Sequence, residues 1–280
     1  MEKQARIISF LNMKGGVGKT TLCINIAYTL VKHFSKKVLL IDMDPQFNAT
    51  QSLMNKYYTT DKYLELKKEG KSVIKIFDND FSLIASEEEL KKEKKLTTRL
   101  EDNFDLVMGD LDLIKVESGQ RGTENLLREF VESDDILYAY DYILIDCPPT
   151  HSFYTSASLI TSNFYLAPLK PDVYSTLGLE LLKYVVSNVN RFHKANVQPV
   201  KPLGVVFTMI NSSRNRQSQI VEGLKKQYSD QIKFFKHHST EYEYIATGKI
   251  ETFLYDMQTT KEEIINITKE FIEEIDNHER

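Results

Sequence analysis

The segment of residues 14–21, with the sequence Lys-Gly-Gly-Val-Gly-Lys-Thr-Thr, constrains the fold of this 280-residue chain more than any other segment. It stands between an apolar run at 7–11 and a stretch with helical character at 22–34. Its glycines let consecutive backbone N–H groups converge on an anion, and the positive end of the following helix adds to that attraction. A strand, a glycine-rich turn and a helix in this order predict a phosphate-binding loop, and therefore a nucleotide-binding protein.

The side chains of this loop have distinct expected roles. The common pattern G-x-x-x-x-G-K-[ST] is not met, because Met13 stands where its first glycine would be, and Lys14 supplies an additional cation. We expect Lys19 to reach the β- and γ-phosphates and Thr20 to offer its hydroxyl to Mg²⁺. Thr21 is expected to contact the α-phosphate. The backbone is expected to enclose the phosphates at Gly15, Gly16, Val17 and Gly18.

The sequence of the loop resembles the deviant Walker A motif of the ParA/MinD ATPases. In that family the additional lysine crosses a dimer interface to the phosphates of the nucleotide bound by the other subunit. The resemblance therefore implies this role for Lys14. It also implies ATP as the nucleotide and a homodimer in the ATP state.

Two further apolar segments end in acidic residues, as expected for buried parallel strands that open onto a site at their carboxyl ends. The first, 38–42, continues as Asp-Met-Asp-Pro-Gln and resembles the switch I motif D-x-D-P-Q of the ParA proteins. The resemblance implies that Asp44 positions the attacking water and that Asp42 lies near the metal shell. The second, 142–146, resembles a Walker B strand, which implies that Asp146 holds Mg²⁺ through water.

The pattern along the chain predicts an α/β fold, with a doubly wound, mostly parallel sheet and helices on both faces. We interpret residues 1–280 as one domain with a charged, solvated insertion at about 55–102. Within that insertion, short helices are expected at 72–77 and 90–99. Besides the segments at 7–11, 38–42 and 142–146, strands are expected at 104–108, 164–169, 203–208 and 232–235.

Base recognition is suggested by the segment 207–214, which resembles the T-M-x-[DN] segment that lines the adenine pocket in ParA proteins. This implies base contacts for Met209 and Asn211, although a packing role for Met209 is an equal alternative. The later loop at 236–240 falls where the family closes the other side of the base. The loop at 236–240 lacks the sequence motif that is typical of the family at this position.

Charge is distributed unevenly along the chain. Residues 181–250 contain eleven Lys and Arg and four Asp and Glu, a net charge of +7, which leaves −11 for the rest of a chain of net charge −4. A basic segment in an acidic protein is typical either of a polyanion-binding face or of an ordinary lysine-rich surface. ParA proteins bind DNA non-specifically through this half of the chain. The resemblance favours DNA-binding roles for Arg191, Lys194, Arg214, Arg216, Lys225 and Lys226.

Several classes of protein are disfavoured by what the sequence lacks. We expect no signal peptide, no membrane span and a cytoplasmic, nucleoid-associated protein. The helix expected at 261–280 carries an apolar stripe but seven acidic residues, so we expect it to pack on the sheet rather than to bind anionic lipid. With Cys23 and Cys147 as the only cysteines, neither a disulfide framework nor a C-x-x-C metal site is available.

Three functions fit these observations. The first is an ATPase that partitions plasmid or chromosomal DNA together with a ParB-like centromere-binding partner. A second is a ParA-like ATPase that positions a protein cargo, and a third is a metabolic enzyme that uses a similar phosphate loop. We favour the first, because the resemblance to the ParA proteins implies DNA segregation.

Overall fold

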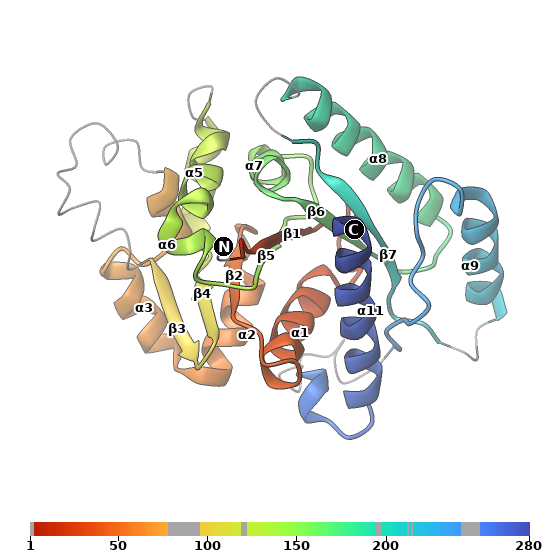
Figure 1. Cartoon of the computed structure of the whole chain (residues 1–280), viewed down its shortest axis with the longest axis horizontal. Helices are drawn as coiled ribbons and strands as arrows, with labels where there is room; N and C mark the ends of the chain where they lie inside the picture. Colours follow the sequence, from red (N-terminus) through yellow and green to blue (C-terminus); the bar gives the residue numbers. More distant parts are fainter. Residues whose placement is uncertain are drawn as a thin grey trace.

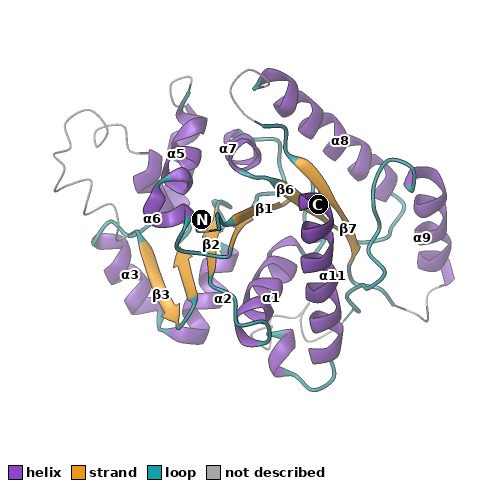
Figure 2. Cartoon of the chain, in the orientation of Figure 1, coloured by secondary structure: helices purple, strands orange, loops and turns teal. Residues whose placement is uncertain are grey.

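The computed structural model describes residues 3–77, 96–118, 122–193, 198–211, 213, 215–241 and 253–280. These residues form one seven-stranded sheet in the order β3-β4-β2-β5-β1-β6-β7, with helices on both faces (Figures 1 and 2). The strands are β1 (Arg6–Phe10), β2 (Val38–Asp42), β3 (Thr97–Glu101), β4 (Phe104–Val107), β5 (Tyr142–Asp146), β6 (Phe164–Leu169) and β7 (Lys201–Phe207). The helices that cover them are α1 (Lys19–Lys32), α2 (Asn48–Tyr57), α3 (Thr60–Lys68), α5 (Leu126–Glu132), α6 (Asp134–Leu137), α7 (Phe153–Thr161), α8 (Ser175–Phe192), α9 (Asn215–Tyr228) and α11 (Lys261–Glu279). Short 3₁₀ segments are η1 (Val73–Phe77), η2 (Leu111–Ser118), η3 (Thr123–Asn125) and η4 (Leu254–Asp256).

The sheet is parallel except at one edge, which confirms the predicted fold class. Strands β4, β2, β5, β1, β6 and β7 pair in parallel, and β3 pairs with β4 antiparallel. The ends of three adjacent strands are in register, because Asp146 of β5 lies opposite both Phe10 of β1 and Asp42 of β2. Parallel pairing thus gathers the acidic strand ends and the loop that follows β1 at one edge of the sheet.

Alternating side chains of the strands supply two separate hydrophobic layers. Ile7 of β1 and Ile41 of β2 belong to the layer that α5, α7, α8 and α9 cover. Ile8 of β1 and Leu40 of β2 belong to the opposite layer, under α1, α2 and α11. Burial on both faces explains why these strands are apolar without interruption.

The last helix packs on the sheet as predicted. In α11 the buried positions are Ile264, Ile267, Thr268, Glu270, Phe271 and Ile275. The Phe271 ring stacks on Phe10 of β1 at a centroid distance of 6.4 Å. The apolar stripe is therefore used against α1 and the sheet. Among the described residues, no helix is both long enough and apolar enough to cross a bilayer.

Three local predictions were wrong. Residues 232–235 do not form a strand: they cross β7 and pair with it at one bridge, Val205 to Phe234. The helix expected at 90–99 is contradicted at its carboxyl end, because residues 97–101 form strand β3. Thr98 and Leu100 alternate along this strand and are both buried. Residues 90–95 lie outside the described part. The described part of the insertion is also not simply solvated, since Leu66, Val73 and Phe77 are buried. The short helix expected at 72–77 is confirmed by η1.

Candidate functional site

The predicted phosphate loop joins the carboxyl end of β1 to the first turn of α1. Gly16 has φ 70° and Gly18 has φ 79°, both in the left-handed region that favours glycine. Gly18 is the N-cap of α1 and no side chain caps this helix, so N–H groups of its first turn remain available to an anion. A Cβ atom built at Gly15 or Gly16 would meet nothing within 4 Å, so both positions face open space. The loop therefore has the geometry of an anion cradle.

Lys19 lies inside this loop. Lys19 is only 6% exposed, and its Nζ donates a hydrogen bond to the backbone oxygen of Lys14 at 3.2 Å. Burial lowers the pKa of Lys19, and the nearby carboxylates of Asp146 and Asp44 oppose that shift. The ammonium is thus held at the mouth of the cradle, where an anionic ligand would compensate its desolvation.

Thr20 and Asp146 lie in direct contact at the base of the loop. The Thr20 hydroxyl donates to Asp146 Oδ2 at 2.7 Å, and the second oxygen, Oδ1, is buried without a hydrogen-bond partner among the described residues. Burial, followed by the charge of Asp42, raises the pKa of the Asp146 carboxyl well above its ordinary value. An orphaned carboxylate oxygen beside a threonine hydroxyl is suited to a hard cation.

The donor set fits Mg²⁺ better than a metal held by protein alone. In the described part of the chain no group of three or more His, Cys, Asp or Glu side chains is arranged to hold a metal. Mg²⁺ keeps several waters and commonly binds one or two carboxylates together with substrate phosphates. Thr20 and Asp146, next to an anion cradle, meet that description.

Asp42 is placed differently from Asp146. Its carboxylate accepts hydrogen bonds from the backbone N–H and the hydroxyl of Thr50, both at 2.8 Å, and from the backbone N–H of Asp44 at 3.2 Å. Burial raises the pKa of Asp42 to about 7 despite these bonds. The contacts attach the first turns of α2 to the end of β2. A place for Asp42 near the metal shell stays a prediction.

Asp44 begins the turn that leads from β2 to α2. The residue is 6% exposed, its carboxylate accepts the backbone N–H of Gln46 at 2.9 Å, and its backbone oxygen accepts the N–H of Phe47 at 2.7 Å. Phe47 adopts a left-handed φ of 43° and stacks on Tyr63 of α3 at 5.6 Å. The turn thus holds Asp44 at the same edge of the sheet as Asp146.

Lys14 has a partner within its own chain. Its ammonium forms an ion pair with Asp172, just before α8, and lies 5.8 Å from the centre of the Tyr174 ring. Partial burial raises the pKa of Asp172, but the hydrogen bond and charge of Lys14, together with the hydrogen bonds from Tyr174 and Ser175, outweigh burial and leave the pKa below its ordinary value. In this structure Lys14 therefore points along the edge of the sheet toward α8.

A small cavity of about 80 Å³ adjoins the loop on the side of the segment 208–211. Met209, with a left-handed φ of 54°, lines it, and its Cε lies 3.7 Å from a Cβ built at Gly18. Asn211 does not line the cavity: its side chain accepts from Ser213 and donates to Glu241. The full lining is Gly18, Thr21, Leu22, Lys170, Thr208, Met209, Ser239, Thr240, Glu241 and Leu254.

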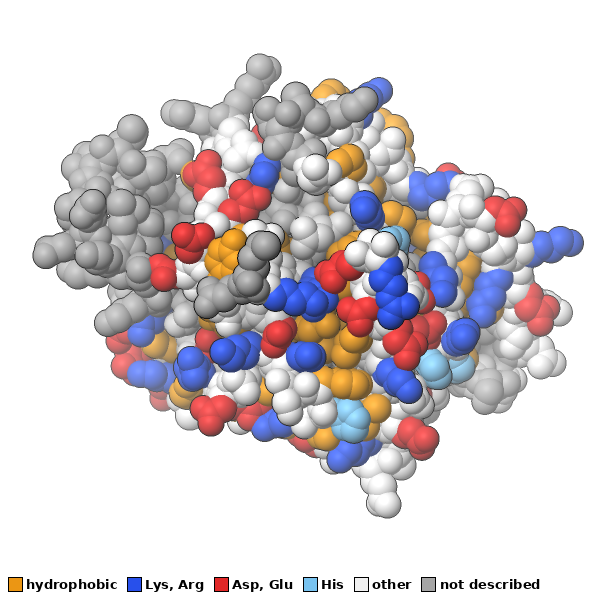
Figure 3. All heavy atoms as spheres, viewed as in Figure 1, with side chains coloured by type: hydrophobic (Ala, Val, Ile, Leu, Met, Phe, Trp, Pro, Cys, Tyr) orange, Lys and Arg blue, Asp and Glu red, His pale blue; other side chains and the backbone are white. Residues whose placement is uncertain are grey.

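The predicted DNA-binding residues that the structure describes are all exposed. Arg191 lies in the last turn of α8, and Arg216, Lys225 and Lys226 lie on α9. Figure 3 shows Lys and Arg side chains gathered on the α9 side of the molecule, with acidic side chains among them. Lys194 and Arg214 lie outside the described residues.

Three residues of this region were not predicted from the sequence. Asp172 holds Lys14, Thr208 donates its hydroxyl to the backbone oxygen of Val17 at 2.7 Å, and Gln217 binds the backbone on both sides of Ile210. Thr208 begins the T-M-x-N segment and could have been found from that motif. No pattern in the sequence marks Asp172 or Gln217, because their roles depend on contacts between distant segments.

Comparison with known proteins agrees with this geometry. A family model described as an AAA domain matches residues 5–199. The chain is 30% identical to the chromosome partitioning protein ParA of Myxococcus xanthus, over 81% of this chain and 73% of that protein. It is 29% identical to the sporulation initiation inhibitor protein Soj of Bacillus subtilis, over 81% of each. A plasmid partition protein of Borrelia burgdorferi, solved with AMPPNP, shares the fold with a TM-score of 0.73 and 23% identity, over 97% of this chain and 99% of that one.

Proposed function

This chain belongs to the ParA and Soj group of the AAA domain family, and on that premise we propose that it is a Mg²⁺-dependent ATPase that partitions DNA. One observation supports the ATPase assignment most directly. The hydroxyl of Thr20, in the uncapped first turn of α1, contacts Asp146, whose other carboxylate oxygen is buried and has no hydrogen-bond partner among the described residues. This arrangement suits a phosphate-bound cation.

Each residue of the site has a proposed part in hydrolysis. The amides at 15–18 and the side chains of Lys19 and Thr21 bind the phosphates of ATP, and Thr20 and Asp146 hold Mg²⁺, with Asp42 beside them. The metal would neutralise phosphate charge. Asp44 orients the attacking water, and Lys14 and Lys19 stabilise charge on the transferring phosphoryl group, since this reaction depends on positioning and electrostatics. Met209 lines the base cavity, and Asn211 acts through Glu241.

The proposed cycle depends on a second copy of the chain. Residues 1–280 act as one ATPase domain, and ATP closes a homodimer in which Lys14 serves the nucleotide of the other subunit. In the ATP state the exposed basic residues of α8 and α9 bind double-stranded DNA without sequence preference. A ParB-like partner stimulates hydrolysis, and the protein acts in the cytoplasm on the nucleoid.

DNA binding measured with ATP, with ADP and without nucleotide across a salt series tests the proposal. We expect binding with ATP that weakens steeply with salt, because phosphate contacts release counterions. Replacing Lys225 and Lys226 together by Glu should weaken binding to all sequences. The matched control replaces Lys37 and Lys68 by Glu, which changes the net charge equally at exposed positions away from α9.

Two results would contradict the proposal. If ATP is hydrolysed but DNA is not bound at any salt concentration, both ParA-like functions fail, namely DNA partition and the positioning of a protein cargo. If neither ATP-dependent dimers nor DNA complexes form, a metabolic enzyme with a similar loop is favoured. Equal loss of binding in both double variants would show that net charge matters rather than the α9 surface.

A further inference from the structure

The carboxyl end of β7 contacts both the phosphate loop and helix α9. On one side, the Thr208 hydroxyl donates to the backbone oxygen of Val17 at 2.7 Å, and Met209 reaches toward Gly18. On the other side, the Gln217 side chain of α9 donates to the backbone oxygen of Met209 at 3.3 Å and accepts the N–H of Asn211 at 2.8 Å. Residues 208–211 therefore form a wall between the nucleotide side and the basic helix.

This wall is braced by backbone pairing as well. Ile210 donates to the oxygen of Ser239 at 2.9 Å, and Ser239 donates to the oxygen of Phe207 at 2.9 Å. Ser239 and Met209 both line the base cavity. A shift of the wall on nucleotide binding would thus be transmitted to the residues of α9 that contact its other side.

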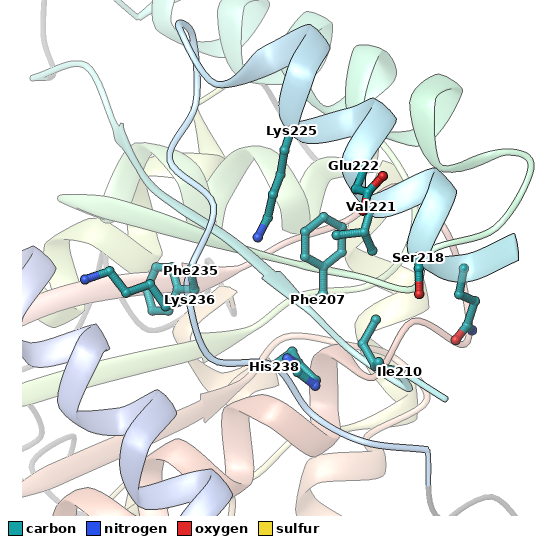
Figure 4. A pocket seen from close by; sticks show the side chains of 10 residues that line it. Phe207, Ile210, Ser218, Val221, Glu222, Lys225, Phe235, Lys236 and His238 are labelled. Atoms are coloured by element: carbon teal, nitrogen blue, oxygen red, sulfur yellow. The ribbon is translucent and has the colours of Figure 1, made fainter. Parts of the chain in front are cut away.

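Gln217 is the polar link behind the wall. The residue is 7% exposed, and among the described residues it makes both side-chain hydrogen bonds that join α9 to 208–211. Further along α9, a cavity of about 340 Å³ separates the helix from the segment that follows α9, with Val221, Glu222 and Lys225 on one side and Lys236 and His238 on the other (Figure 4). The helix is buried again only at Leu224 and Tyr228.

The polar attachment of the amino-terminal half of α9 is accordingly made through Gln217, while Ile220 and Val221 add partly buried apolar contacts with the core. Arg216 is the neighbour of Gln217 in the sequence and is exposed, and Lys225 and Lys226 lie on the same helix. A buried amide with both its donor and its acceptor in use has little freedom to change partners, because an unsatisfied polar group is costly. Movement of the wall must then carry the first turn of α9 with it.

We propose that Gln217 is a positioning residue that couples the nucleotide state to the DNA-binding helix. The DNA-affinity measurement that tests this inference rests on the proposed function, whereas the hydrogen-exchange measurement does not. Coupling between two ligands is reciprocal, so ATP and DNA should raise the affinity for each other by the same factor. Loss of Gln217 should make the two sites independent without removing either.

The main experiment compares DNA affinity in two nucleotide states. Wild type, Gln217→Leu, Gln217→Glu and the control Gln219→Leu, which is exposed on the same helix, are titrated with a fluorescent random-sequence duplex in Mg²⁺-AMPPNP and in Mg²⁺-ADP. We expect the ratio of the two affinities in wild type to lie within the ~5- to 150-fold range typical of allosteric coupling. Gln217→Leu should bring that ratio close to one, and Gln219→Leu should keep it.

Gln217→Glu is included because Gln217→Leu could lose coupling simply by failing to fold. It keeps the acceptor for the Asn211 N–H and loses the donor to Met209, so we expect a partial loss of coupling. Binding of a fluorescent ATP analogue should be retained in both Gln217 variants. Gln217 variants that keep the wild-type ratio would overturn the inference.

Hydrogen exchange of residues 215–228 separates this inference from the proposed function. AMPPNP should change the protection of these amides in wild type, and this change should be lost in Gln217→Leu. If the wild-type protein binds no DNA, the proposed function fails, and the exchange result still decides the inference. An α9 whose protection is the same with and without nucleotide would refute the coupling.

Discussion

Lys14 and Asp172 form an ion pair within a single chain, between the phosphate loop and the start of α8. Asp172 is itself held in place, because its carboxylate accepts the N–H of Tyr174 at 2.9 Å and its backbone N–H donates to Ser175 Oγ at 2.8 Å. If Lys14 serves the nucleotide of another subunit, it must first leave this partner. On the proposed role of Lys14, the ion pair with Asp172 would therefore oppose dimer formation.

Replacing Asp172 by Asn should strengthen ATP-dependent dimerisation. The two side chains are 33% and 29% exposed, so the pair contributes only about 0–1 kcal/mol and the free energy of unfolding should change little. Because dimer formation would break one such pair in each of the two subunits, its loss should lower the dimer Kd by up to about 25-fold, since 1 kcal/mol corresponds to about fivefold. Sedimentation velocity with AMPPNP measures this, and Lys14→Ala is the control that removes the cation itself. A weaker dimer in Asp172→Asn would instead mean that Asp172 presents Lys14 to the other subunit.

Replacing Asp146 by Asn should stabilise the metal-free protein at high pH. Burial raises the pKa of the native Asp146 carboxyl well above its ordinary value, so ionising it disfavours the folded state, and stability falls as pH rises above about 4. The variant lacks this titration. At pH 8 in EDTA we expect it to be more stable than wild type by about 1–3 kcal/mol, with the gap closing toward pH 4.

Urea unfolding at pH 4, 6 and 8 measures that difference. In Mg²⁺-ATP the order should reverse, because wild type alone gains from the bound metal. ATP turnover by the variant should fall at least about 100-fold, a loss of the size expected when an electrostatic contribution is removed. A variant that is less stable than wild type at pH 8 in EDTA would show that the Thr20 contact outweighs burial of the charge.

Replacing Gly109 by Ala should destabilise the end of β2. A Cβ atom there would lie 2.8 Å from Cγ of Asp42 and 2.8 Å from Cβ of Phe47, both held in place. Overpacking of this kind costs about 1–3 kcal/mol, so thermal unfolding should shift down. ATP turnover should fall too, because Asp42 and Phe47 flank Asp44.

Gly223 provides the matched control on α9. A Cβ at that exposed helical position would meet nothing within 4 Å, so Gly223→Ala should raise stability by about 0.5–1 kcal/mol. Equal destabilisation by both alanines would mean that the close contact at Gly109 is not the cause.

The two cysteines should be unreactive in the folded protein. Both are free and buried, and burial raises the pKa of Cys147 to about 12 and the pKa of Cys23 well above its ordinary value. At pH 8 neither thiol is ionised appreciably, so neither should attack a disulfide reagent. Ellman's reagent should detect no thiol in native protein and both thiols in guanidinium chloride. Fast labelling of the native protein would show that the layers around α1 or β5 open readily.

Local chemistry explains which predictions from the sequence hold. Strands buried on both faces are apolar throughout, and the loop at 14–21 combines residues that few other structures need, so the central sheet and the cradle were predicted at nearly the right residues. The edges were harder. β3 was missed and 232–235 was expected to be a strand, because whether a short, partly exposed segment pairs depends on the neighbour that tertiary structure brings to it.

The site divides in the same way. The order of motifs along the sequence determines that Lys19, Thr20 and Asp146 meet at one edge of the sheet, since parallel strands place their carboxyl ends there. Only the tertiary structure decides that Asp172 holds Lys14, that Thr50 donates hydrogen bonds to Asp42, and that Gln217 attaches α9 to the segment 208–211. Each of those contacts joins side chains from separate loops and helices, and their geometry is set by how the helices pack on the sheet rather than by any local pattern.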